Sequence, residues 1–253
     1  MRIAVFHPGA MGSRLAAELV AAGHQVQWVP AGRSAASAER AGAAGLIGTT
    51  FADAVGTAEV VLCSCAPQGA VEIAREVGAA GFTGLYVDAN PLSPSSLASI
   101  AEALAAATFV DAGVIGPPPV GGKRTDLLLA GPEVEVVAEL FSGTAVSPRV
   151  VGSAVGAASA AKSAFALYNK GRLALATLAF GLAEHHGVTD ALVAQATRPH
   201  AGDLAEPGLA EDLRRVAWRW GPEFDEIAET LTDAGLDPEP IRALREVWTR
   251  LAE

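Results

Sequence analysis

Lys162 stands in a stretch of small residues, Gly156 to Gly171, and its type and setting suit acid/base chemistry. A lysine exchanges protons near neutral pH when desolvation by apolar neighbours lowers its pKa. On a helix, Phe165 and Asn169 share its face, three and seven residues further along the chain. We expect Lys162 to be a catalytic acid/base, with Phe165 and Asn169 contacting the substrate. The alternative is an ordinary helix lysine whose ammonium group extends to solvent.

A second candidate site lies at Ile3–Gly12, IAVFHPGAMG, where an apolar strand-like run turns into a helical pattern. A helix N-terminus carries unpaired N–H groups and a partial positive charge, and it binds a pyrophosphate readily. Gly9 would let the backbone approach the phosphates, and Gly12 would let the helix pack against the strand. The residues expected to bind a dinucleotide here are Pro8, Gly9, Ala10, Met11 and Gly12. The alternative is an ordinary turn of another doubly wound protein.

The residues that follow the second predicted strand indicate which dinucleotide is bound. A preference for NAD requires an Asp or Glu there, hydrogen-bonded to the ribose 2′-hydroxyl. The chain instead continues as Val29–Ser34, and its first acidic residue after the strand is Glu39. Arg33 can pair with a 2′-phosphate, and Ser34 can donate a hydrogen bond to it. The sequence therefore predicts NADP(H), unless Arg33 is only a solvated loop residue.

Asn90 follows the predicted strand Leu85–Asp88, at the end of the strand where open α/β sheets bind ligands. We expect its carboxamide to hydrogen-bond to the substrate or to the nicotinamide, which makes it a catalytic and cofactor-binding residue. The alternative is a role in forming the turn. Asp88 and Asp111 also end strands, and we expect them to brace loops or cap helices rather than react.

The two cysteines, Cys63 and Cys65, fall in a predicted strand from Glu59 to Cys65. Residues two apart point to the same face of a strand, and a C-x-C pair without further ligands is not a zinc site. We expect two buried thiols in a reducing cytosol and no metal site. The residues expected to form a loop over the cofactor ribose are Cys65, Ala66 and Pro67.

Strand and helix patterns alternate along the first part of the chain. The predicted strands are Ile3–Phe6, Gln25–Val29, Leu46–Ile47, Glu59–Cys65, Leu85–Asp88, Phe109–Ala112, Leu127–Ala130 and Ala145–Val151. The predicted helices between them are Gly12–Ala22, Ser34–Ala44, Ala52–Ala58, Gln68–Ala80, Pro94–Ala107 and Pro132–Phe141. Such alternation is typical of an α/β fold, here a Rossmann-type doubly wound parallel sheet. Because no strand pattern follows, we expect a nucleotide-binding domain at residues 1–152 and an all-helical substrate and dimerisation domain at residues 153–253.

Composition excludes several classes of function. The 253 residues carry a net charge of −10 without a concentrated basic face, so we expect no nucleic acid partner. The longest uncharged part of the helical region, Leu173–Ala183, is about half the ~20 residues that a membrane span needs. The chain begins at once with a strand pattern, which leaves no room for a signal peptide. We expect a cytoplasmic protein that acts on a small molecule, without a membrane segment.

Four stretches, in this order, carry a resemblance to a known family: FHPGAMGSRLAAELVAAGH (Phe6–His24), VDANPLSP (Val87–Pro94), DAGVIGPPP (Asp111–Pro119) and GAASAAKSAFALYNKG (Gly156–Gly171). They are similar to the glycine loop, nicotinamide loop, substrate loop and lysine helix of the β-hydroxyacid dehydrogenases, the group of 3-hydroxyisobutyrate and 6-phosphogluconate dehydrogenases. Within it, the chain looks closest to a branch of small bacterial oxidoreductases with a shortened helical C-terminal domain. The resemblance implies an NADP-dependent dehydrogenase, a homodimer, catalysis by Lys162, and a substrate loop at Val114, Ile115 and Gly116.

The chain departs from the family pattern at three places. His7 stands where the family has a glycine, and we expect it to keep extended strand-end dihedrals that a non-glycine residue tolerates. Ile115-Gly116-Pro117 replaces a serine and two glycines, which removes one hydroxyl and one N–H donor for a substrate carboxylate. Ala166 stands where the family places an asparagine. A less charged substrate is therefore plausible.

These observations favour an NADPH-dependent oxidoreductase that transfers hydride between nicotinamide and a small carbonyl or hydroxy compound. The altered substrate loop leaves an imine (C=N) reductase open as the alternative. A non-catalytic NADP(H)-binding sensor and a hydride exchanger with a deazaflavin are further alternatives, and the long helical part of the chain argues against the last.

Overall fold

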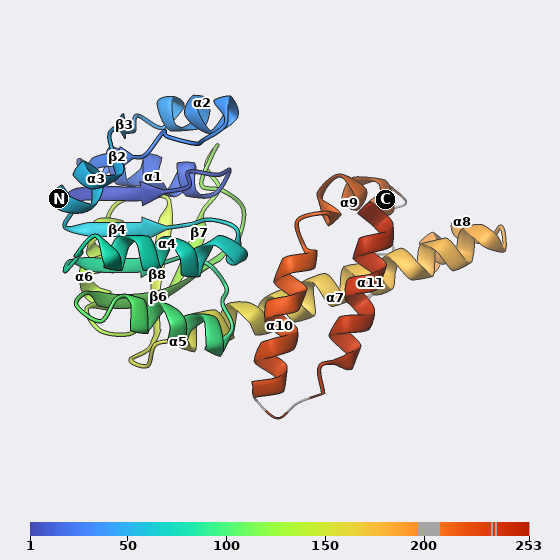
Figure 1. Ribbon diagram of the computed structural model, residues 1–253. Helices are drawn as coiled ribbons and strands as arrows, with labels where there is room; N and C mark the ends of the chain where they lie inside the picture. Colours follow the sequence, from blue (N-terminus) through green and yellow to red (C-terminus); the bar gives the residue numbers. More distant parts are fainter. Residues whose placement is uncertain (197–207, 234, 236, 253) are drawn as a thin grey trace. The chain divides into compact units, whose positions relative to one another are not determined.

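The computed structural model describes residues 1–196, 208–233, 235 and 237–252 (Figure 1). The chain forms two compact units, Met1–Lys162 and Ser163–Glu253. The first unit contains the sheet, and every described element of the second unit is a helix. The predicted fold class, a doubly wound sheet followed by helices alone, is confirmed.

The first unit is built on an eight-stranded sheet with the strand order β3-β2-β1-β4-β5-β6-β7-β8. The strands are β1 (Arg2–Phe6), β2 (Gln25–Trp28), β3 (Ile47–Gly48), β4 (Val60–Cys63), β5 (Leu85–Asp88), β6 (Thr108–Ile115), β7 (Thr125–Ala130) and β8 (Val146–Gly152). All neighbours are parallel except β6 and β7. The direction of strand addition reverses between β1 and β4, and a doubly wound sheet binds its ligand at that switch point.

The register of the central strands brings their carboxyl ends into one row. Phe6 pairs with Cys63, Cys63 with Asp88, and Asp88 with Asp111. The segments that follow β1, β4 and β5 therefore leave the sheet side by side, next to Asp111 in the middle of β6. This alignment gathers the glycine turn, the Cys65 loop and the Asn90 loop at one edge, although they lie far apart in the sequence.

Six helices cover the two faces of the sheet: α1 (Gly12–Ala21), α2 (Ala35–Ala43), α3 (Phe51–Thr57), α4 (Pro67–Ala79), α5 (Pro94–Ala103) and α6 (Val134–Leu140). One core joins α1, α2 and α6 to the sheet, and a second core joins α3, α4 and α5 to its other face. Three of these helices begin at a serine or threonine whose hydroxyl accepts a backbone N–H: Ser34, Thr50 and Ser93. Such N-caps explain why the helices start where the sequence predicts them.

Strand β6 is longer than the predicted Phe109–Ala112. Its extension pairs with β7 from Gly113 opposite Leu128 to Ile115 opposite Asp126. The antiparallel partner β7 forms hydrogen bonds with the backbone N–H and C=O groups of these residues. A local sequence pattern cannot show that such a partner is present. The added residues include Val114 and Ile115, so two of the three residues predicted to form the substrate loop lie in the strand instead.

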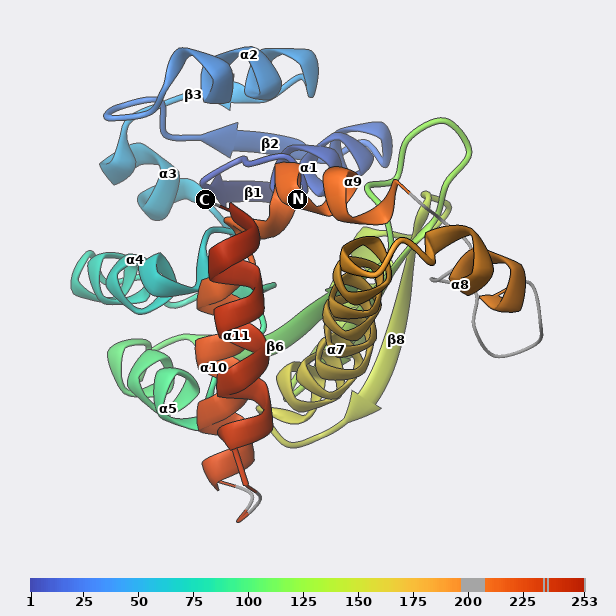
Figure 2. The same ribbon diagram turned by 90° about the vertical axis from the view of Figure 1, so that its right-hand side faces the viewer.

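The second unit is a helical bundle. Its helices are α7 (Ala157–His185), which begins in the first unit, α8 (Thr189–Ala196), α9 (Leu209–Ala217), α10 (Gly221–Asp233) and α11 (Glu239–Ala252). Helices α10 and α11 run side by side in both views (Figures 1 and 2). Trp248 is fully buried at the centre of this core, edge-on to Trp220 with ring centroids 4.5 Å apart. Among the described residues, none of the helices combines the length and the apolar character that crossing a membrane requires.

The packing of α4 against the segment that ends α5 makes Gly78 a sensitive position. A Cβ atom at Gly78 would overlap the Ala103 carbonyl oxygen, whereas Gly42 of α2 has open space around it. We expect Gly78→Ala to lower the free energy of unfolding by about 1–3 kcal/mol, because backbone must move to relieve the clash. The matched Gly42→Ala should raise it by about 0.5–1 kcal/mol through helix propensity. Urea unfolding followed by circular dichroism measures both, and equal effects would contradict this account of the packing.

Candidate functional site

The turn between β1 and α1 leaves the start of the helix open to a ligand. Met11 occupies the N-cap position, and no side chain caps the helix with a hydrogen bond. The Gly9 N–H donates to the His7 carbonyl oxygen at 2.6 Å, which closes a tight turn. A helix N-terminus of this kind carries unpaired N–H groups and a partial positive charge, and phosphates bind there.

His7 has a conformation that the sequence analysis did not expect. Its φ is 58°, in the left-handed region, so the expectation of extended dihedrals is wrong. The following Pro8 disfavours the right-handed helical region for the residue before it, and the chain must still reverse within the turn. A residue with a Cβ atom is strained there by roughly 1–2 kcal/mol relative to glycine.

The two glycines of the turn have different surroundings. A Cβ atom at Gly12 would lie 3.2 Å from Ser64 Cβ and 3.3 Å from Ser64 O, so only a glycine lets α1 approach the segment after β4 this closely. A Cβ atom at Gly9 would meet nothing nearer than His7 O at 3.9 Å. Gly12 therefore serves packing, and Gly9 leaves open space beside the turn.

A cavity of about 440 Å³ opens beside this turn, at the carboxyl ends of β1 and β4. Eight residues predicted to bind the cofactor line it: Gly9, Ala10, Met11, Gly12, Arg33, Ser34, Cys65 and Ala66. Four further lining residues were not predicted: His7, Gly32, Ser37 and Ser64. Ser37 lies one helical turn after the N-cap Ser34, a spacing that could have indicated a second hydroxyl at this position. Pro8 and Asn90 are buried and do not line the cavity, and Pro67 begins α4.

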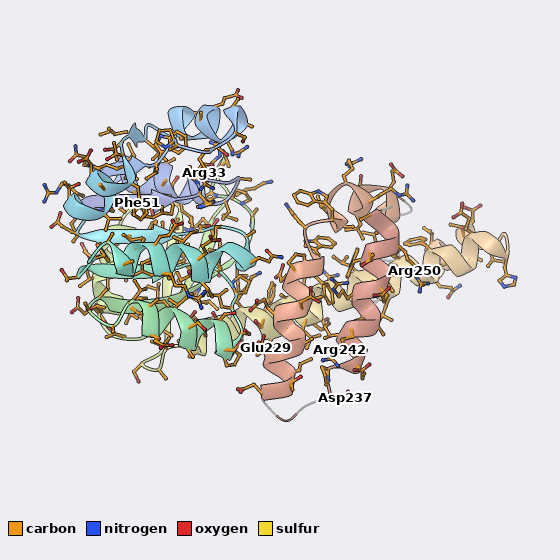
Figure 3. All side chains as sticks on the ribbon, viewed as in Figure 1. Arg33, Phe51, Glu229, Asp237, Arg242 and Arg250 are labelled. Atoms are coloured by element: carbon orange, nitrogen blue, oxygen red, sulfur yellow. The ribbon has the colours of Figure 1, made fainter. Side chains whose placement is uncertain are left out.

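A second cavity of about 210 Å³ adjoins the first, because Arg33 and His7 line both. Its other walls are mostly apolar and come from β1, the segment after β2, α3 and α4: Phe6, Val29, Ala31, Phe51, Ile73 and Glu76. Phe6 and Phe51 are in contact, with ring centroids 5.6 Å apart. Figure 3 labels Arg33 and Phe51, which come from these different elements. This cavity could not be predicted from the sequence, because only the sheet brings its walls together.

The two cavities fit NADP(H) by the chemistry of their walls. The open helix N-terminus suits a pyrophosphate, and the mostly apolar second cavity suits an adenine ring. Arg33, Ser34 and Ser37 stand at the first cavity, and they supply a cation and hydroxyl donors of the kind that bind a phosphomonoester. Among the described residues, no cluster of histidine, cysteine and carboxylate side chains could hold a metal ion.

Asn90 holds the loop that follows β4. Its side chain is 3% exposed, and its Oδ1 accepts a hydrogen bond from the Cys65 N–H at 3.1 Å. Its Nδ2 donates to Asp88 Oδ1 at 2.7 Å. This bond to Cys65 also explains why β4 ends at Cys63 rather than at Cys65 as predicted. Both ends of the Asn90 carboxamide are therefore engaged within the protein.

The two thiols lie next to this network. Cys63 is fully buried, Cys65 is partly buried at the cavity wall, and their Sγ atoms are 3.8 Å apart without a disulfide. The hydrogen bond with Cys65, together with burial, raises the pKa of the Cys63 thiol. Cys63 is therefore the inert member of the pair.

Asp88 and Asp111 are fully buried carboxyl groups on adjacent strands. Burial raises the pKa of Asp88 to about 7, against the opposing effect of its hydrogen bonds from Asn90. Burial also raises the pKa of Asp111, whose hydrogen bonds from Ser159 and Gly156 oppose the shift. The end of the sheet beneath the site thus contains a carboxyl group that titrates near neutrality.

Asp111 fixes the start of α7, the helix that carries Lys162. Its Oδ2 accepts the backbone N–H groups of Gly156 and Ser159, both at 2.9 Å, and its Oδ1 accepts the Ser159 hydroxyl at 2.6 Å. The Leu92 N–H in turn donates to Ser159 Oγ at 3.3 Å. The buried carboxylate caps the start of α7, and a capping role was expected, although Asp111 lies in the middle of β6 and not at a strand end. Ser159 links this cap to the Asn90 loop, a role that the sequence analysis missed.

Lys162 lies in the second turn of α7 and packs against β6. A Cβ atom at Gly113 would lie 2.9 Å from Lys162 Cβ and 3.0 Å from Ala158 O. Gly113 thus lets the stem of Lys162 lie directly on the strand, while the residue as a whole is half-buried. Gly113 was not singled out in the sequence, although the alternation of a strand places it on the same face as Asp111.

The predicted substrate residues lie in different surroundings. Ile115 packs near Ala157 and Ala158 of α7, whereas Val114 packs into the core on the opposite face of β6. Gly116 has a φ of 109°, which favours glycine, and it ends the strand. In the second unit, Phe165 is 45% exposed, and Asn169 Oδ1 accepts a hydrogen bond from Arg172 Nη2 at 2.8 Å.

Two family models match the chain. Residues 2–90 match the family described as NADP oxidoreductase coenzyme F420-dependent, and residues 183–251 match a domain of unknown function, DUF1932. The first match covers the glycine turn, Arg33, the Cys65 loop and Asn90. Residues 2–90 are therefore similar to an NADP oxidoreductase domain, and the prediction of NADP as the cofactor is confirmed.

Solved structures share the complete fold. A conserved protein of unknown function, described as structurally similar to 3-hydroxyacid dehydrogenases, is 25% identical with a TM-score of 0.76, over 99% of this chain and 96% of that one. The 3-hydroxyisobutyrate dehydrogenase of Mycobacterium tuberculosis is 20% identical with a TM-score of 0.76, over 99% and 93%. An imine reductase from Pseudomonas sp. is 20% identical with a TM-score of 0.62, over 98% and 94%.

Among curated proteins, an uncharacterized 28.5 kDa protein of Methanothermus fervidus is 27% identical over 143 residues. That match spans 56% of this chain and 55%, about half, of the curated relative. The fold of the chain is that of the 3-hydroxyacid dehydrogenases, and its first part is similar to the NADP oxidoreductase family. The predicted resemblance to the β-hydroxyacid dehydrogenase group is confirmed.

The raised pKa of Asp88 predicts how stability depends on pH. Its pKa is about 7 in the folded protein against an ordinary 3.8, so the folded state holds the proton more tightly than the unfolded chain does. The free energy of unfolding therefore falls as pH rises from about 4 to about 7, by up to ~4 kcal/mol for this one group. Asp88→Asn should remove this part of the dependence, because the amide keeps the acceptor for Asn90 and does not titrate.

Urea unfolding between pH 4.5 and 8, followed by fluorescence, measures the effect. Asp190→Asn, at an exposed position of α8, is the matched control and should leave the pH profile unchanged. Parallel profiles for the wild type and Asp88→Asn would contradict the assignment.

Proposed function

We propose that this protein is an NADPH-dependent oxidoreductase that transfers hydride between nicotinamide and a small carbonyl or hydroxy compound, with Lys162 as the acid/base. The observation that carries the proposal is the cavity of about 440 Å³ at the switch point of the sheet, with an uncapped helix N-terminus on one side and Arg33 on another. A cation beside hydroxyl donors at the end of β2 suits a 2′-phosphate better than a free 2′-hydroxyl.

The two cavities bind different parts of the cofactor. The backbone from Gly9 to Gly12 binds the pyrophosphate, and Arg33 with Ser34 and Ser37 binds the 2′-phosphate. The adenine ring occupies the second cavity, between Phe51 and the apolar side chains of β1 and α4. Cys65 and Ala66 pass over the ribose. Asn90 acts as a positioning residue, because its carboxamide fixes the backbone of Cys65.

Lys162 supplies the proton transfer. When bound, NADP(H) accepts or donates the hydride at the substrate carbon. As the C–H hydride leaves, Lys162 takes the proton of the substrate hydroxyl, and the C–O bond becomes a carbonyl. In the reverse direction its ammonium group gives the proton to the carbonyl oxygen. The hydrogen bonds of Asp111 to α7 and the contact with Gly113 hold the lysine stem in place for both steps.

The substrate is bound by the end of β6, by the turn that follows it and by the face of α7 that carries Lys162. We assign Val114 and Ile115 to the strand end, Gly116 to the turn, and Phe165 and Asn169 to the helix part. Ile115 and Gly116 offer fewer hydrogen-bond donors than a serine-glycine-glycine loop, so a weakly charged substrate fits better than a strong carboxylate. Val114 acts through packing, since its side chain contacts the core.

We also propose a cytoplasmic homodimer. Apolar side chains on α7 are exposed in the single chain, with Phe165 at 45%, Tyr168 at 71% and Leu175 at 61%. Three large side chains on one exposed helix are typical of a surface that a second subunit covers.

Reduction of a C=N bond is the second candidate. The shared fold of an imine reductase and the presence of Ala166 instead of the expected asparagine favour it. A panel of ketones, cyclic imines and an oxidised deazaflavin, each assayed with NADPH by loss of absorbance at the reduced nicotinamide band, separates the candidates. Oxidation of NADPH by none of them would favour a sensor protein.

The role of Arg33 predicts a change in nucleotide selectivity. Arg33→Ala should weaken NADPH binding by about 10- to 100-fold, because it removes the charge-assisted hydrogen bonds to the 2′-phosphate. NADH binding should stay nearly unchanged. Arg75→Ala, at an exposed position of α4, is the matched charge control. Titration calorimetry with both nucleotides gives the four dissociation constants. Equal affinities of the wild type for NADPH and NADH would remove this part of the proposal.

The role of Lys162 predicts loss of turnover without loss of cofactor. Lys162→Met should reduce kcat by at least ~100-fold, because general acid–base catalysis contributes that much, and change the Kd for NADPH less than about twofold. Lys162→Arg keeps the charge but does not release its proton near neutral pH, so it should be equally inactive. If Lys162→Arg were active, Lys162 would act only through its charge. If Lys162→Met were active, the assignment of Lys162 as the acid/base would be wrong.

A further inference from the structure

The backbone conformation of His7 is strained for a residue that has a side chain. Its φ of 58° lies in the left-handed region, where a glycine would fit without strain. Strained backbone positions persist where the side chain has a use, and they gather at ligand sites. His7 lines both cavities of the candidate site, which makes its imidazole part of the surface that a nucleotide would contact.

The imidazole is bonded to the residue proposed to bind the 2′-phosphate. Arg33 Nη1 lies 2.7 Å from His7 Nδ1. A guanidinium has only donors, so Nδ1 must be the acceptor, and a neutral imidazole is required in the free protein. Burial, and after it the charge of Arg33, lowers the pKa of His7, in agreement with this neutral form. The pair holds the guanidinium at the boundary between the two cavities.

The charged and titratable groups around His7 come from four elements. Arg33 follows β2, Arg40 of α2 donates to the Pro8 carbonyl oxygen at 3.4 Å, Cys65 follows β4, and Glu76 of α4 lines the second cavity. Two of the four are cations, so a positive charge on His7 is disfavoured while the site holds no anion. A dianionic phosphate at this place would reverse the balance, since an opposite charge within a few ångströms favours the protonated imidazole.

We propose that His7 and Arg33 together recognise the 2′-phosphate of NADPH and that His7 takes up a proton when it binds. The inference rests on the proposed function, because it takes NADPH as the cofactor. In the free protein, neutral His7 orients Arg33. In the complex, one proton from solvent adds to the imidazole, and the imidazolium and the guanidinium both donate to the phosphate oxygens. NADH has no phosphate at this position and binds without proton uptake.

The proposal predicts a proton linkage that differs between the two nucleotides. At pH 7.5 the phosphate, with a second pKa near 6, is already dianionic, so uptake must come from the protein. We expect uptake of roughly 0.5 proton per NADPH and close to none per NADH. The affinity for NADPH should rise as pH falls from 8 toward 7, and the affinity for NADH should stay constant.

Calorimetric titration of the full chain in buffers of different ionisation enthalpy measures the protons directly. His7→Asn is the test variant, because asparagine tolerates the left-handed region and hydrogen-bonds without titrating. It should lose the proton uptake and bind NADPH about 10-fold more weakly, with NADH binding unchanged. His7→Gly should behave likewise and fold at least as stably. His24→Asn removes a histidine that lines neither cavity, and it should keep the uptake.

Two results would overturn the inference: equal proton uptake with NADPH and NADH, or uptake that persists in both His7 variants. Either result with tight NADPH binding would leave the proposed oxidoreductase standing. Failure of both nucleotides to bind the wild-type protein would instead remove the proposed function and this inference with it.

Discussion

The buried carboxylate of Asp111 is the interaction on which the arrangement of the site depends. It ends the central run of parallel pairings in the sheet and accepts three hydrogen bonds from the first turn of α7. Desolvation opposes the charge, and these bonds together with the helix dipole offset the cost. These bonds act together with the packing of Ala158 and Lys162 on the sheet to hold the helix that carries Lys162 against β6.

The N-termini of α7 and α1 both attract an anion, but the anion comes from a different source in each case. The N-terminus of α7 receives its anion from within the protein, because Asp111 supplies a carboxylate that no ligand can replace. The N-terminus of α1 has no side-chain cap and faces a cavity, so its anion must come from outside. One helix start is therefore structural and the other functional, although both use the same unpaired N–H groups.

Two residues, Asn90 and Ser159, connect the wall of the cavity to the start of α7. Asn90 contributes both ends of its carboxamide to holding the Cys65 loop and Asp88, which leaves the wall of the cavity rigid before a nucleotide arrives. Ser159 joins this loop to the start of α7. The cofactor side and the lysine side of the site are thus parts of one hydrogen-bonded network at the carboxyl ends of β4 and β5 and in the middle of β6.

Features that depend on neighbours along the chain could be predicted from the amino-acid sequence. Strand and helix periodicity, the glycine turn and the Arg33–Ser34 pair are all local, and the structure contains them at nearly the predicted positions. The capping role of Asp111 was also within reach, because a carboxylate is a good partner for a helix start.

Features that need partners distant in the sequence became visible only in the folded chain. The left-handed His7, the end of β4 at Cys63 and the added length of β6 follow from a turn, a hydrogen bond and an antiparallel neighbour that no local pattern reveals. The second cavity and the contact between Gly113 and Lys162 likewise join segments far apart in sequence. The physical reason is that strand order and register set which chain ends meet, and both are settled by packing over the whole sheet.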